Sequence, residues 1–340
     1  MHVRKINILN AVLILGSCAI AFKIPFELFM FSYAVLGPLH YLTEINWLYD
    51  RKLFTGSKVN FWWFTLFGII WCLGYLVAYF SKTIFGYLPE GLVAESRLVG
   101  MGYFITITSI YIAFVSSYLM VGSNKMKSWY AIMAIALLAI LITKLPIYLI
   151  VVGFIPNLIH VIIFTGTFML WGALKGQSVS GLWTFTLYVV CAVTCVIPSL
   201  KDADFMISDD VNQNFIQSGL RGINANLVMF LTGDNTSNNH LSAVGIKIQR
   251  LIAFSYTYHY LNWFSKTSII EWHKTSKTKL ILITILWITS VGIYTYSFKL
   301  GVLILLTLSI VHVMYEFPLN QRSFFEIRGA IRLWREKIRK

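Results

Sequence analysis

Long apolar runs recur along the whole chain, and they constrain its fold more than any other feature. Many approach the roughly 20 residues that a helix needs to cross a bilayer. Charged residues make up only 12% of the 340 residues, against about 25% in soluble proteins. In lipid, a segment of this length must satisfy its own backbone hydrogen bonds, which favours helices. We therefore expect an all-α fold, a polytopic transmembrane helix bundle.

Ten segments fit this description. They are residues 6–22, 24–48, 60–81, 99–121, 128–144, 146–174, 180–198, 246–265, 278–297 and 299–316. Lysine and arginine gather on one set of connections if both termini are cytoplasmic, which the positive-inside rule favours. The first segment follows basic residues, as in a signal peptide, but no small-residue cleavage site follows it. We expect a retained first helix and a multi-pass protein of a bacterial inner membrane.

Two regions stand apart from the predicted spans. We place the transmembrane bundle at residues 1–318. Within that range, residues 199–245 form an extracytoplasmic loop segment. Residues 319–340 form a basic tail with the pattern of an amphipathic helix. Such a helix is expected to lie on the anionic inner leaflet, although a tail that serves only topology fits equally well. Because topology explains the net charge of +14, we expect no nucleic-acid partner.

The cysteines indicate no site at the level of sequence. Cys18, Cys72, Cys191 and Cys195 all lie in apolar runs, and the last two are one helical turn apart. We interpret them as small buried residues rather than as a disulfide or a zinc site.

Histidines provide the main functional signal. In the ten-span topology, four spans that run from outside to inside each carry one histidine at a similar depth. These residues are His40, His160, His259 and His312. Two of them have a carboxylate one helical turn later, Glu44 after His40 and Glu316 after His312. Ionisable groups at membrane depth usually face the bundle interior in pairs.

Imidazole and carboxylate groups one turn apart can bind one metal ion, or the carboxylate can orient the imidazole. We predict metal ligation by His40, His160, His259, His312 and Glu44. Glu44 is also a candidate catalytic proton acceptor, and His273, just past the eighth span, is a candidate catalytic group at the entrance. Nitrogen and oxygen donors without cysteine suit non-haem iron, with zinc as an alternative. Asn262, three residues after His259, could hold the ring orientation.

Two segments resemble a known family. GPLHYLTE (residues 37–44) and YTYHYLNW (residues 256–263) are similar to the histidine segments of membrane-embedded non-haem iron enzymes of the bacteriorhodopsin-related carotene-cleaving dioxygenase type. The resemblance implies an iron held by histidines from several helices and a long isoprenoid substrate. The chain departs from the family pattern at Leu39 and Tyr41, which flank His40, and at Trp263, where a second histidine is expected.

The sequence thus favours an integral membrane metalloenzyme, a non-haem iron oxygenase or other oxidoreductase that acts on a membrane lipid or isoprenoid near the cytoplasmic leaflet. One alternative is a haem-binding electron-transfer protein in which two histidines are axial ligands. Another is a non-enzymatic transporter or assembly component, whose histidines relay protons or only pack.

Overall fold

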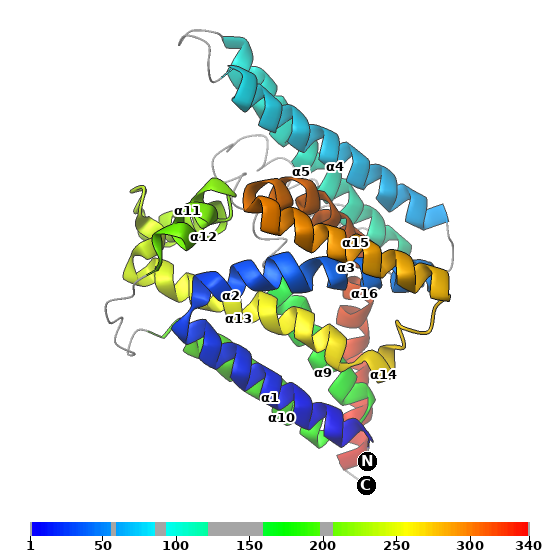
Figure 1. The fold of residues 1–340 in the computed structure, drawn as a ribbon. Helices are drawn as coiled ribbons and strands as arrows, with labels where there is room; N and C mark the ends of the chain where they lie inside the picture. The colour runs from blue at the N-terminus through cyan, green and yellow to red at the C-terminus, as the bar shows by residue number, and fades with distance from the viewer. Residues whose placement is uncertain (1, 56–58, 86–92, 122–158, 198–206, 339–340) are drawn as a thin grey trace. The chain divides into compact units, whose positions relative to one another are not determined.

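The computed structural model describes residues 2–55, 59–85, 93–121, 159–197 and 207–338 (Figure 1). The all-α prediction is confirmed, because these residues form helices and their connections and contain no strand. The predicted span at 128–144, and the first part of the predicted span at 146–174, lie outside the described residues.

Four of the described helices are long and apolar enough to cross a membrane: Val3–Lys23, Asn60–Val77, Lys277–Tyr296 and Phe298–Glu336. Three further apolar helices are shorter, at Phe104–Met120, Ile159–Lys175 and Val179–Thr194. These helices are compatible with a membrane protein. The full set of ten spans and the cytoplasmic termini stay predictions.

The chain divides into two compact units, each described by itself. The first unit comprises residues 1–44, 157–306 and 323–340, and the second comprises residues 45–156 and 307–322. Two helices contribute to both: α3 (Gly37–Asp50) and α16 (Phe298–Ile338). The domain boundary predicted between residues 318 and 319 lies inside α16, beside Pro318.

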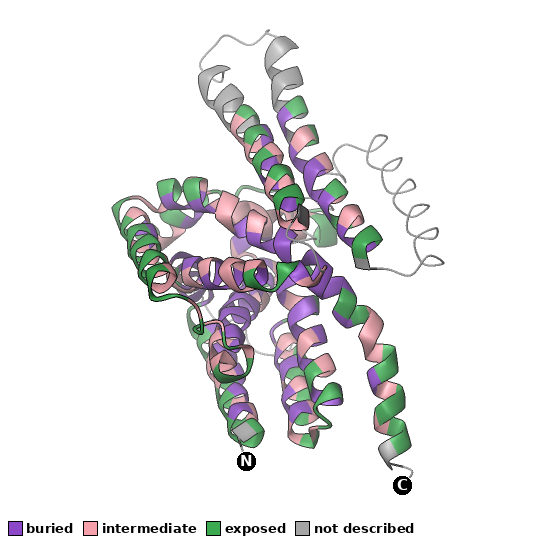
Figure 2. Ribbon diagram, turned by 90° about the vertical axis from the view of Figure 1, so that its right-hand side faces the viewer, coloured by how far each residue is buried: buried purple, intermediate pink, exposed green. Residues whose placement is uncertain are grey.

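Most described elements belong to the first unit. In chain order they are α1 (His2–Lys23), α2 (Pro25–Phe31), η1 (Ser32–Leu36), η3 (Ile159–Phe164), α9 (Thr165–Lys175), α10 (Val179–Thr194), α11 (Asp209–Gln217), α12 (Arg221–Thr232), η4 (Asn239–Leu241), α13 (Ala243–Ser265), α14 (Thr267–Ile270) and α15 (Lys277–Tyr296). The second unit contains η2 (Lys52–Phe54), α4 (Val59–Phe85) and α5 (Val93–Val121). The C-terminal part of α16 returns to the first unit and is largely exposed (Figure 2).

Helix α13 is the core of the first unit. It packs against α1, α2, η1, η3, α10 and α12, and its residues are buried on all sides. Polar side chains fix several of these contacts. The hydroxyls of Ser32 and Thr257 are 2.7 Å apart, and the Tyr258 hydroxyl donates to Asn10 Oδ1 at 3.0 Å. Hydrogen bonds of this kind hold helices together where lipid supplies no hydrophobic driving force.

The expected span at 24–48 is a continuous helical run with one irregular stretch. Lys23 ends α1, Ile24 has non-helical dihedrals, and Pro25 opens α2, where its missing N–H costs nothing. Before Pro38 the helix widens into a π-helical turn, η1. Since Pro38 has no N–H for the carbonyl four residues earlier, a wider turn accommodates it. This turn ends directly before α3, and His40 lies in the first turn of α3.

Close helix packing defines the second unit. A Cβ added at Gly74 of α4 would lie 2.8 Å from the backbone oxygen of Gly102 and 2.8 Å from the nitrogen of Thr106, both on α5. Only glycine permits backbones to approach so closely. The α16 part of this unit packs on α4 through Tyr315, whose ring stacks on Phe61 with centroids 4.4 Å apart.

A small helical layer occupies the loop segment that the sequence places outside the membrane. The Ser208 side chain caps α11 by accepting from Val211 N, and α12 ends at Gly233 in the left-handed conformation. Phe215 of α11 is fully buried and meets Phe26 of α2 edge-on at 5.0 Å. This apolar contact attaches the layer to α2.

His240 is the buried polar centre of this layer. Its side chain is 0% exposed, and its ring packs beside the rings of both Phe26 and Phe215. Its Nε2 is 3.0 Å from Asn212 Oδ1, and because an amide oxygen only accepts, Nε2 donates. Burial, and secondarily the Arg221 charge, lower the pKa of His240 from 6.5 to about 4. The imidazole is therefore neutral in the folded layer.

This pKa predicts acid sensitivity of the loop layer. The unfolded layer takes up a proton near pH 6.5 and the folded layer only near pH 4, so stability falls as the pH drops through this interval. Between about pH 6.5 and pH 4, the ratio of folded to unfolded layer should fall by up to about tenfold for each pH unit. Above this interval, His240 should not affect that ratio. Hydrogen exchange of α11 and α12 at several pH values measures the effect. The His240→Gln variant should lose this pH dependence, and an unchanged profile would contradict the assignment.

Candidate metal centre

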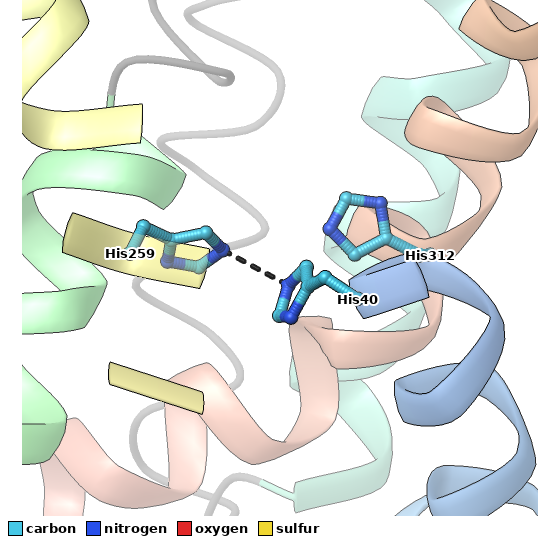
Figure 3. Close-up of side chains that lie close together, drawn as sticks. All are labelled: His40, His259 and His312. Carbon is cyan, nitrogen blue, oxygen red and sulfur yellow. Dashed lines mark hydrogen bonds between the residues drawn. The ribbon is translucent and has the colours of Figure 1, made fainter. Parts of the chain in front are cut away.

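Two buried histidines from distant parts of the chain meet inside the first unit. His40 of α3 is 1% exposed and His259 of α13 is 8% exposed. Their Nε2 atoms are 3.1 Å apart, the contact drawn as a dashed line in Figure 3. The two rings are nearly perpendicular, with centroids 4.7 Å apart. Buried ring nitrogens this close together could hold a metal ion.

Thr165 determines which nitrogen of His259 points at His40. Its hydroxyl lies 2.8 Å from His259 Nδ1, so the other ring nitrogen, Nε2, is the one that faces His40. Thr165 is the first residue of α9 and is 1% exposed. Partners on the outer ring nitrogen are what fixes the orientation and basicity of metal-binding histidines.

Glu44 approaches the same ring nitrogen of His40 as His259 does. Its Oε2 lies 3.0 Å from His40 Nε2, one turn along the same helix. Glu44 is 1% exposed, so its carboxylate is removed from water together with both histidines. The i, i+4 spacing noted in the sequence therefore produces a buried imidazole–carboxylate pair.

His160 is a third buried histidine at this site. It lies in the π-helical turn η3 and is 2% exposed. Its ring meets that of His259 edge-on, with centroids 4.9 Å apart. π-helical turns are rare and often mark functional sites, and here one such turn contains His160 while another directly precedes α3.

Aromatic and hydroxyl side chains enclose the pair. The hydroxyls of Tyr41 and Tyr260 are 2.6 Å apart, and the Tyr260 ring lies 5.1 Å from the His40 ring. A Cβ at Gly37 would lie 3.0 Å from the Tyr41 hydroxyl oxygen, so glycine at this position leaves room for the two tyrosine hydroxyls. Trp263 stands edge-on to His40 at 5.6 Å and donates its indole N–H to Thr43.

Two further predicted site residues, His312 and His273, come from other segments of the chain. His312 and Glu316 are buried on the α16 segment that belongs to the second unit, and the positions of the two units relative to one another are not determined (Figure 1). There, Asn320 donates to Glu316 Oε2 at 3.3 Å. His273 lies in the exposed turn between α14 and α15, beside Trp272. Their roles stay predictions from the sequence.

Thr165 is the site residue that the sequence did not indicate. We expected Asn262 to orient His259, but the Asn262 side-chain oxygen lies 3.4 Å from the Tyr258 hydroxyl, while Thr165 bonds the His259 ring. A threonine in an apolar helix is common and carries no signal of its own. The only available indication was its place five residues after His160.

No family model, characterised protein or solved structure matches this chain. The case for a function therefore rests on the chemistry of the site.

The Tyr41–Tyr260 hydrogen bond gives a test of the site's structure. Removing one hydroxyl leaves the other buried without this partner, so Tyr41→Phe and Tyr260→Phe should each cost about 1–3 kcal/mol of stability. The double variant should cost clearly less than the sum, because neither hydroxyl is then left behind. Unfolding of the protein in detergent measures the four free energies. Strictly additive losses would show that the two hydroxyls do not bond.

Proposed function

We propose that this chain is an integral membrane metalloenzyme, a non-haem iron oxygenase or related oxidoreductase that acts on a lipid or isoprenoid. The observation that supports it is the buried contact of His40 with His259 at 3.1 Å. With it we propose ten spans, cytoplasmic termini, a bacterial inner membrane and a site near the cytoplasmic leaflet.

The contacts of His40 Nε2 favour a cation at this position. This atom lies 3.1 Å from His259 Nε2 and 3.0 Å from Glu44 Oε2. A neutral ring nitrogen carries either one proton or one lone pair, so it makes only one full hydrogen bond of the two. A metal ion bound among the three atoms would engage a lone pair of each. Ligands about 2.1 Å from a common metal lie about 3.0–3.4 Å apart, which fits the separations of His40 Nε2 from His259 Nε2 and from Glu44 Oε2.

The donor set favours iron over the alternatives. Two imidazoles and a carboxylate are the ligand types of non-haem iron oxygenases that keep open positions. Zinc can use the same donors and remains an alternative. In a haem with two axial histidines the macrocycle lies between the ligating nitrogens, whereas His40 and His259 are in direct contact. Axial ligation of haem by this pair is therefore not favoured.

The residues around the site would then have distinct tasks. His40 and His259 hold the ion with Glu44 as a ligand or proton acceptor, and His160 and His312 are further candidate ligands. Thr165 orients His259, and the rings of Tyr260 and Trp263 exclude water. When bound, iron supplies the capacity to activate oxygen. His273, exposed in its turn, would act at the entrance.

A second candidate function is supported by the same contacts. Glu44 Oε2 and His259 Nε2 both lie close to His40 Nε2, at 3.0 and 3.1 Å, and the Thr165 hydroxyl lies 2.8 Å from His259 Nδ1. Polar groups in such contact can pass protons through a membrane protein without any metal. A transporter of this kind would contain no stoichiometric metal, so metal analysis separates the two functions.

Metal content is the direct test. Purified full-length protein should contain about one iron per chain, and His40→Ala and His259→Ala should lose it, because each removes a ligand that the other cannot replace. His240→Gln, a change at a buried histidine in the loop layer, should retain the metal. Elemental analysis with an absorption spectrum measures this. Metal-free wild-type protein, or full occupancy in both alanine variants, would exclude the metalloenzyme.

Thr165 gives a matched pair of variants. Thr165→Val keeps the shape of the side chain but removes the oxygen that orients His259, while Thr165→Ser keeps that oxygen. We expect Thr165→Val to weaken metal binding about 10–100-fold and Thr165→Ser to change it little. Competition with a chromophoric chelator measures both affinities. Equal affinity in the two variants would show that the Thr165 contact does not orient a ligand.

A further inference from the structure

Three buried thiols come together on the face between α1 and α10, in a part of the first unit that the proposed metal centre does not use. The side chain of Cys18 of α1 lies close to those of Cys191 and Cys195. The three are 9%, 5% and 1% exposed. All three are free thiols in this structure.

The register of the two helices explains why these thiols meet. Helices α1 and α10 lie side by side (Figure 1), and Asn7 donates to Ser178 and Ser180 at 3.1 and 2.8 Å. Cys18 follows Asn7 by eleven residues, and Cys191 follows Ser180 by eleven. Eleven residues complete about three helical turns, so both pairs lie on the same faces of two helices that run in the same direction.

We propose that Cys18 forms a reversible disulfide with Cys191 or Cys195, which makes this cluster a redox-responsive link between α1 and α10. Cys18 is shared by both possible bonds, and the third thiol can exchange with the one formed. A thiol that contacts two others one turn apart is suited to such exchange, because a thiolate attacks a neighbouring disulfide directly. Simple packing does not require the only three cysteines of this unit to touch.

The chemistry balances with an apolar disulfide as oxidant. The Cys18 thiol loses its proton and attacks 4,4′-dipyridyl disulfide, which forms a mixed disulfide and releases one thiopyridone. The thiol of Cys191 or Cys195 then loses its proton and attacks the Cys18 sulfur, which releases the second thiopyridone. Two thiols are oxidised to one disulfide, and two electrons and two protons leave with the reagent.

The test uses full-length Cys72→Ser protein, since Cys72 lies in the second unit and contacts Thr307. After reaction, peptide mapping without reductant should find α1 linked to α10 in most chains, and dithiothreitol should reverse the link. Cys18→Ser in this background should abolish the link, because both bonds share Cys18. Cys191→Ser and Cys195→Ser should each retain one link.

The controls make a negative result decisive. The same protein, denatured before reaction, must titrate all three thiols, which proves that the reagent is effective. If folded protein instead carries separate pyridyl adducts, or if its thiols stay unmodified while the denatured ones react, the thiols do not form a redox pair. A link that persists in Cys18→Ser would equally overturn the proposal. None of these outcomes depends on metal binding at His40 and His259.

Discussion

Polar side chains buried among apolar helices have no water to bond, so each must find a partner on a neighbouring helix. This constraint organises the first unit around α13. Along that helix, Thr257 bonds α2–η1, Tyr258 bonds α1, His259 bonds α9 and α3, and Tyr260 bonds α3. Four consecutive residues thus point in different directions and reach different helices. A helix that is polar at successive positions and still buried must be central, and α13 is.

The sequence predicts the helical class and part of the site for the same reason. Apolar runs long enough to span a bilayer are visible without any tertiary information, and depth within a run follows from counting residues. That count places His40, His160 and His259 at a similar level, and the structure brings these three together. The spacing of His40 and Glu44 is local to one helix, so their contact also follows from the sequence.

The depth of a residue along its span does not fix how a helix is rotated or how far it is shifted against its neighbour. The contacts that the sequence did not predict all depend on this rotation and shift. Thr165 meets His259 because a π-helical turn ends just before it and changes the face that α9 presents. Tyr41 and Tyr260 meet because Gly37 leaves space between two helices. We read the cysteines as packing residues, yet Asn7 and its serine partners set α1 against α10 so that three thiols coincide. Each case joins positions more than 90 residues apart or depends on irregular backbone.

The two polar clusters of the first unit differ in the softness of their donors, and they lie on different helices. Imidazole and carboxylate come from α3 and α13, while the thiols come from α1 and α10. Thiolates bind copper(I) and zinc strongly, whereas nitrogen and oxygen donors suit iron. A thiol beside His40 and His259 would shift the donor set away from the proposed iron, and the thiol would itself be open to oxidation there. With sulfur on a separate helix pair, the proposed nitrogen- and oxygen-donor centre and the proposed dithiol can coexist in the first unit without competing for the same ion.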